Sequence, residues 1–126
     1  MSTFMTAALL VLGSGPIEVV ATAGPSSDVG FEELAAGDNL AAISAIEAGS
    51  LPASDPARLI NHGVALARLG DHEGAREKFA EVVADSDRYR LETGSGKWVD
   101  SRVLARRGLS LIDRGEFEGY AALASR

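Results

Sequence analysis

The chain contains no cysteine, and this absence excludes several kinds of structure and chemistry. Without thiols there is no disulfide, no zinc site with cysteine ligands, no thiol nucleophile and no lipid attached through cysteine. Only two histidines are present, His62 and His72, and neither belongs to an H-E-x-x-H pattern. We therefore expect no catalytic, cofactor-binding or metal-binding residues in this protein.

Aromatic residues and positive charge are also scarce. The 12 Lys and Arg residues are outnumbered by 18 Asp and Glu residues, which gives a net charge of −6 and argues against a nucleic-acid partner. Aromatics make up only 6% of the chain, whereas Ala, Leu and Gly are plentiful. This composition favours closely packed helices over a β sandwich, and 126 residues suit one small domain.

The first 23 residues carry a single charge, Glu18, and have the layout of a secretion signal. An apolar run over residues 4–12 is followed by glycine and proline, and then by the small-residue site Ala21-Thr22-Ala23. Residues 1–23 are therefore predicted to direct export, which implies a periplasmic or secreted protein with no stable membrane span after cleavage. No basic residue precedes the apolar run, however. A buried helix in a cytoplasmic protein and a retained anchor remain alternatives, although the run is shorter than the ~20 residues that span a bilayer.

Residues 24–27 read as a linker, and residues 28–126 show helical periodicity with no clear strand alternation. Asp55 is a candidate N-cap for a helix that begins with Pro56. The polar segment 85–96 is expected to be a loop. The predicted helices cover residues 31–35, 40–46, 57–69, 73–84, 98–112 and 117–123.

Two of these helices share the same skeleton of large residues and glycines. Small residues inside a helix allow a partner helix to approach closely, and a glycine at the helix end can adopt a positive φ. After the first copy, the small residue Ala75 is expected to admit the preceding helix, and the ring of Phe79 to fill the resulting groove. The two copies are Leu59-x3-Gly63-x2-Leu66-x3-Gly70 and Leu104-x3-Gly108-x2-Leu111-x3-Gly115.

With Ala75 and Phe79 added, this skeleton resembles the tetratricopeptide repeat family. The turn glycines Gly37 and Gly70 are 33 residues apart, close to the family's 34-residue period, whereas Gly70 and Gly115 are 45 apart. The resemblance implies an all-α fold, a short right-handed superhelix of three antiparallel helix–turn–helix units. Its units would be residues 28–55, 56–88 and 98–126, with an inserted loop over residues 89–97.

The resemblance also implies which residues face a ligand. In the family, the second and sixth positions of each first helix line a groove, and these positions hold Arg102, Arg106 and Asn61 here. Some members clamp a terminal carboxylate with Lys or Arg and Asn at such positions. This chain has Ser27 and Phe31 where the first repeat would supply Lys and Asn, so the full clamp is absent. Alternatively, the two arginines are solvated or pair with the acidic first repeat.

The inserted loop interleaves cations with apolar groups in Arg88-Tyr89-Arg90-Leu91, shortly before Trp98. Arg, Tyr and Trp are frequent anchors of binding surfaces, so Tyr89 and Trp98 are candidate partner-binding residues. The alternative is that the two rings pack together as a local cap for the third unit.

Together these features predict a non-catalytic adaptor or scaffold that binds a protein or peptide, exported across the inner membrane of a bacterium. The segment Gly94-Ser95-Gly96-Lys97 does not make it a phosphate-binding enzyme, because the earlier glycine, the preceding buried strand and the Ser or Thr after Lys are missing. The alternatives are a self-associating structural repeat and an accessory subunit of an envelope complex. Oligomeric state and partner identity stay open.

Overall fold

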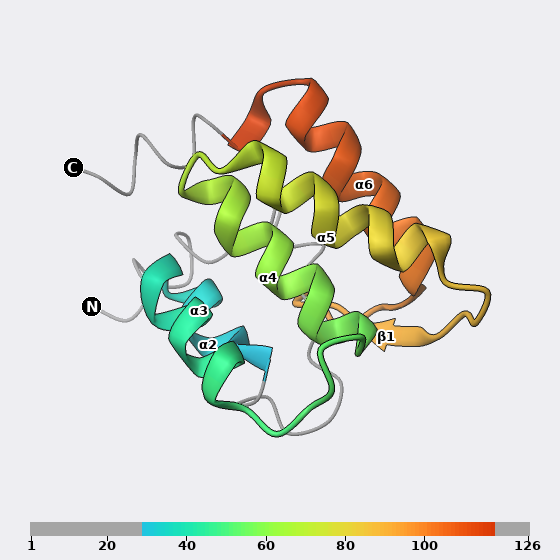
Figure 1. Cartoon of the computed structure of the whole chain (residues 1–126), viewed down its shortest axis with the longest axis horizontal. Helices are drawn as coiled ribbons and strands as arrows, with labels where there is room; N and C mark the ends of the chain where they lie inside the picture. The colour runs from blue at the N-terminus through green and yellow to red at the C-terminus, as the bar shows by residue number, and fades with distance from the viewer. Residues whose placement is uncertain (1–28, 118–126) are drawn as a thin grey trace.

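The computed structural model describes residues 29–117, and these form a mostly helical fold with one small two-stranded sheet (Figure 1). The predicted secretion signal (residues 1–23), the linker and most of the last predicted helix lie outside the described residues. The elements are α2 (Phe31–Ala35), α3 (Asn39–Ala48), α4 (Pro56–Arg68), α5 (His72–Ala84), β1 (Arg90–Glu92), β2 (Trp98–Asp100) and α6 (Ser101–Asp113).

The helix ends follow the local chemistry of the sequence. The Asp55 carboxylate accepts a hydrogen bond from the backbone N–H of Arg58, and Pro56 opens α4, so the predicted N-cap is confirmed. Gly70 follows the C-cap of α4 with φ +92°, and Gly115 occupies the same place after α6 with φ +71°. These left-handed conformations explain why both copies of the repeated skeleton end in glycine.

One aromatic ring joins the three long helices, which lie side by side in Figure 1. Phe79 of α5 is fully buried between Gly63 of α4 and Gly108 of α6. A Cβ atom added to Gly63 would lie 2.9 Å from the ring, and one added to Gly108 would lie 2.5 Å from it. The expectation that Gly63 and Gly108 admit a close neighbour is confirmed, and at both positions that neighbour is the Phe79 ring.

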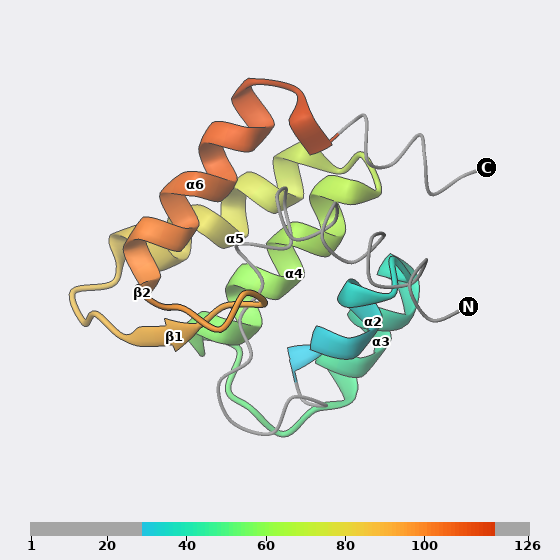
Figure 2. The same cartoon turned by 180° about the vertical axis from the view of Figure 1, so that it is seen from behind.

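The short helices α2 and α3 pack on the side of α4 that faces away from α6 (Figure 2). Two buried polar side chains of α4 link it to this first pair. The Asn61 amide donates to the Val29 carbonyl at 2.8 Å, and the Arg68 guanidinium donates to the Leu34 carbonyl at 2.8 Å. The contacts of α4 therefore extend to both sides, and it occupies the middle of the described fold.

The segment before α6 differs from its prediction. Residues 89–97 are not simply a loop, and the helix predicted to start at Trp98 begins only at Ser101. Instead β1 and β2 form an antiparallel hairpin in which Leu91 pairs with Val99. Burial of the Leu91 side chain in the core stabilises the hairpin. Helix α6 starts at Ser101 because the carboxylate of Asp100 caps it, accepting a hydrogen bond from the Arg102 N–H at 2.8 Å.

Candidate functional site

A groove opens where the hairpin meets the rest of the molecule. The loop before α4, the C-terminal end of α5 and strand β1 enclose about 540 Å³, and β1 lies beside the N-terminal end of α4 in both views (Figure 1 and Figure 2). We call this feature the hairpin groove. Apolar and acidic side chains share its lining, chiefly Leu51, Tyr89 and Leu91 with Asp55, Asp85 and Asp87.

The outer wall of the groove is the segment between α5 and β1, and the start of α6 holds it in place. The Arg102 guanidinium donates to the Asp85 carbonyl, which ties the end of α5 to the first turn of α6. The Tyr89 carbonyl accepts from the Ser101 N–H at 2.7 Å, and the Tyr89 N–H donates to the Ser101 hydroxyl at 3.2 Å. These bonds connect the residue before β1 to the first residue of α6.

An ion pair closes the same wall from outside. Arg88 contacts the Asp100 carboxylate through its Nε at 2.8 Å and a terminal nitrogen at 2.7 Å. Burial acts to raise the pKa of Asp100, but hydrogen bonds from the Arg102 N–H and from Arg88 outweigh it and hold the pKa below its usual value. Asp100 therefore stays ionised while it caps α6 and anchors Arg88.

Three carboxylates of the groove lie near the Tyr89 phenol. The pKa of Tyr89 is raised, first by the carboxylate of Asp87, then by burial and by the carboxylates of Asp85 and Asp55. All three acids therefore act on the same phenol, because a nearby negative charge disfavours the phenolate. Within residues 29–117 none of the three carboxylates forms an ion pair.

The carboxylates are nevertheless oriented by backbone bonds. Asp55 accepts from the N–H of Arg58, and Asp85 accepts from the N–H of Asp87 at 3.0 Å. The one cation in the lining is Arg90, whose guanidinium donates to the Trp98 carbonyl across the hairpin at 3.1 Å. The lining side chains comprise three carboxylates and one guanidinium, and two further guanidinium groups bond to the backbone of the groove: Arg58 to the Leu51 carbonyl at 2.9 Å and Arg102 to the Asp85 carbonyl.

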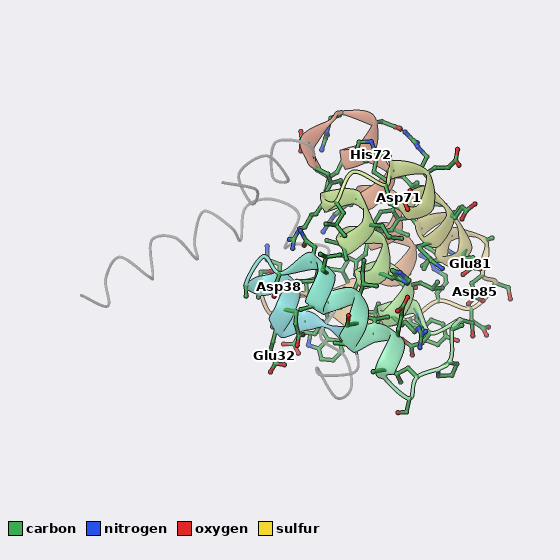
Figure 3. All side chains as sticks on the ribbon, turned by 60° about the vertical axis from the view of Figure 1, so that its left-hand side comes forward. Glu32, Asp38, Asp71, His72, Glu81 and Asp85 are labelled. Atoms are coloured by element: carbon green, nitrogen blue, oxygen red, sulfur yellow. The ribbon has the colours of Figure 1, made fainter. Side chains whose placement is uncertain are left out.

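Figure 3 labels acidic side chains at both ends of α5. Asp71 lies at the start of the helix, next to His72, whereas Glu81 and Asp85 lie near its C-terminal end. Asp71 accepts from the Gly74 N–H as the N-cap of α5. The C-terminal end of α5 thus brings a carboxylate to the groove.

The five partner-binding candidates occupy different places. Tyr89 lines the groove with 42% of its surface exposed, and Arg102 braces the groove wall. Arg106 is exposed one turn further along α6, without an ion pair among the described residues. Asn61 is fully buried and bonded to Val29, so its amide does not reach the surface.

Trp98 lies on the hairpin with 54% of its surface exposed. It pairs with Glu92 in the hairpin, whereas Tyr89 precedes β1 and its carbonyl accepts from Ser101 at the start of α6. The alternative that Tyr89 and Trp98 pack together stays a prediction.

Sequence reasoning missed the three carboxylates of the groove. Asp85 and Asp87 flank one serine directly before Arg88, a local concentration of charge beside the candidate Tyr89 that was readable as a signal. Asp55 had no such signal, because only the folded chain brings the loop before α4 to the end of α5.

The described residues contain no group of three or more histidines and acids arranged to hold a metal ion. His62 is half-buried in α4, and its pKa is lowered by burial and then by the positive charges of Lys78 and Arg58, against the opposing charge of Glu47. The groove itself contains oriented carboxylates and a phenol, which suit the binding of a cationic group.

Comparison with protein-family models, with curated proteins and with solved structures finds no match to this chain. Between residues 29 and 117, no helix has both the length and the apolar character needed to cross a membrane.

Proposed function

We propose that this protein is a non-catalytic adaptor or scaffold that binds a protein or peptide through tetratricopeptide-like helical units. The proposal includes a short right-handed superhelix of three such units, the third beginning at α6. Support comes from the ring of Phe79, which serves α4, α5 and α6 together, and from the contacts of α4 with the elements on both of its sides. Stacked units of this kind bury a continuous core and leave extended surfaces for recognition.

The observation that carries the binding function is the hairpin groove. Its outer wall is fixed to the start of α6 by Arg102, by the Arg88–Asp100 ion pair and by the Tyr89–Ser101 bonds. A wall held in this way does not have to be ordered when a ligand binds, and preorganisation of this kind favours affinity. Nothing in this arrangement requires a bond to be made or broken.

Export to the periplasm or the exterior of a bacterium is part of the same proposal. Its support is the signal-like layout of residues 1–23, with an apolar core ahead of a small-residue site. N-terminal sequencing of the protein recovered from its host tests this point. A mature chain beginning near Gly24 is expected, whereas an intact Met1 on a cytoplasmic protein would refute export.

Site-specific photocrosslinking in the native host tests the binding function. A photoreactive residue at Tyr89 probes the groove, one at Arg106 probes the exposed face of α6, and one at Glu73, exposed early in α5, is the matched control. We expect a defined protein to crosslink from Tyr89 or Arg106 well above the level seen from Glu73. Equal, unspecific labelling from all three positions would overturn the proposed function.

Self-association is the second candidate, and one observation favours it. Leu40 on α3 has 68% of its surface exposed, which is a large exposure for an apolar side chain. Light scattering across a range of protein concentrations separates the two functions. A monomer agrees with the adaptor, whereas a concentration-dependent oligomer that Leu40→Asp abolishes would support the structural repeat. An accessory subunit of an envelope complex would instead crosslink to several proteins that purify together.

A further inference from the structure

We propose that the hairpin groove docks an extended segment of the partner in which a Lys or Arg adjoins a large apolar side chain. This inference rests on the proposed function and specifies its partner. It uses the apolar lining of the groove, the three lining carboxylates that form no ion pair among the described residues, and the fixed walls, which are three separate properties.

The size and lining of the groove fit side chains rather than a flat protein face. A volume of about 540 Å³ lies within the ~300–1,000 Å³ range of ligand sites. Leu51 comes from the loop before α4 and Leu91 from β1, so apolar side chains border the groove on two sides. Leu91 is itself buried, which anchors that side of the groove to the core. An apolar side chain of the partner placed between these walls would be removed from water.

Charge selects the residue beside that apolar group. Asp55, Asp85 and Asp87 come from two different parts of the chain and converge around Tyr89. None of them forms an ion pair within the described residues, and Arg90 is the single cation of the lining. An ammonium or guanidinium group from the partner would complete this charge balance, and the Tyr89 ring offers a face for it.

Other occupants fit less well. An acidic segment, such as one that ends in a terminal carboxylate, would be repelled by the three carboxylates of the groove. The groove therefore favours a positively charged ligand, whereas the arginine-bearing face of α6 favours a negatively charged one. Residues 1–28 contain no Lys or Arg, and residues 118–126 contain only Arg126, so the parts of this chain outside the described fold supply few cations. A segment from a different protein is therefore the occupant to which the proposal commits.

Fluorescence polarisation with defined peptides tests the proposal on the full chain. A positional-scanning library of short, labelled peptides first determines which residue types are selected. The best peptide with a basic residue beside Leu or Ile is then compared with two relatives, one with Glu in place of the basic residue and one with Ser in place of the apolar residue. We expect both relatives to bind about tenfold more weakly or worse, and rising salt to weaken the parent peptide.

Variants of the groove acids provide the second arm. Asp85→Asn/Asp87→Asn removes two charges but keeps side chains that can accept backbone hydrogen bonds, and it should weaken binding by about tenfold or more. The matched control is Glu73→Gln/Glu77→Gln, which removes the same charge from exposed positions of α5 outside the groove and should change binding less than about twofold. NMR shifts of the bound complex should concentrate at Leu51, Tyr89 and Leu91.

Several outcomes would overturn the proposal: selection of acidic peptides, unchanged binding by the Asn double variant, or NMR shifts confined to α6. Binding only to a second copy of the chain, seen by light scattering, would equally replace the proposed occupant. The proposed function fails separately. If crosslinking finds a partner that contacts Arg106 and not Tyr89, the adaptor stands and the groove assignment is wrong. If no partner crosslinks anywhere, the adaptor itself is wrong.

Discussion

Among single residues, Phe79 has the widest influence, because its ring meets helices from both sides of α5. Gly108 makes the closest approach, and a Cβ atom there would lie only 2.5 Å from the ring. We predict that Gly108→Ala lowers the free energy of unfolding by about 1–3 kcal/mol, since overpacking of a filled core forces side chains and backbone to shift. Urea unfolding followed by circular dichroism measures this change.

Two variants separate this clash from a general effect of substitution in α6. Ser110→Ala changes an exposed position of the same helix and should alter stability by no more than about 0.5 kcal/mol. Phe79→Leu shortens the facing side chain, so Gly108→Ala should cost less in that background than in the wild type. A cost that stays the same in both backgrounds would show that the ring is not what Gly108 accommodates.

His62 should make stability depend on pH in a defined direction. Burial and the charge of Lys78 lower its pKa below the ordinary 6.5, so the folded state holds this proton less tightly than the unfolded chain. Its contribution is complete above pH 6.5 and is lost as the pH falls through 6.5 toward the lower folded pKa. We predict that the unfolding free energy falls over this window and that His62→Gln flattens the fall. An NMR titration that placed the pKa of His62 above 6.5 would contradict the prediction.

At the scale of elements, the hairpin depends on the bonds that α6 gives to it. Arg102 joins the end of α5 to the start of α6, because its guanidinium donates to the Asp85 carbonyl. Its role is therefore to stabilise the groove wall and not to contact a ligand. We predict that Arg102→Ala costs about 1–2 kcal/mol of stability, because a charged donor to a carbonyl is lost. Hydrogen exchange should rise over residues 85–92 and much less in α4.

Arg106→Ala is the matched control for this element. It removes the same charge and the same side chain one turn further along α6, at an exposed position. Stability and hydrogen exchange of the hairpin should both stay near the wild-type values. If the two variants loosened residues 85–92 equally, the brace by Arg102 would not be the cause.

The helices and strands also show which parts of the fold could be predicted from the sequence and where the prediction failed. Periodicity and glycine stops gave α4 and α5 nearly to the residue, because capping and close packing are local or helical patterns. The hairpin was missed because its strands have only three residues each, too few for alternation to be visible. The hairpin is stabilised by contacts between residues that are far apart in the sequence, such as the ion pair of Arg88 with Asp100. The residues of the groove could be predicted only in part. The sequence indicates Tyr89 as a binding residue, but Asp55 lies near it only because the folded chain brings the loop before α4 to the end of α5.

At the scale of the whole molecule, α2 and α3 contact the rest of the described fold chiefly through α4, so this interface has a stability of its own. The interface between α4 and the first pair contains a buried cation, Arg68, which donates to the Leu34 carbonyl and lies 3.5 Å from the Asn39 amide oxygen. No feature of the repeated skeleton indicated this residue. Arg68 occupies a buried position of α4 at which an apolar side chain would be expected.

Replacing that cation should therefore loosen one end of the molecule before the other. We predict that Arg68→Met costs about 1–3 kcal/mol, because the length of the side chain is kept while a buried, charged hydrogen bond to the Leu34 carbonyl is lost; that carbonyl keeps the Gly37 N–H as its other donor. The matched control is Arg76→Met, which breaks the exposed ion pair with Asp113 and should cost about 0–1 kcal/mol. Hydrogen exchange should rise in α2 and α3 for Arg68→Met while α5 and α6 keep their protection, since a segment opens locally where its contacts with the rest of the fold are weakened. Uniform loss of protection across all helices would instead show that the described fold unfolds as a single cooperative unit.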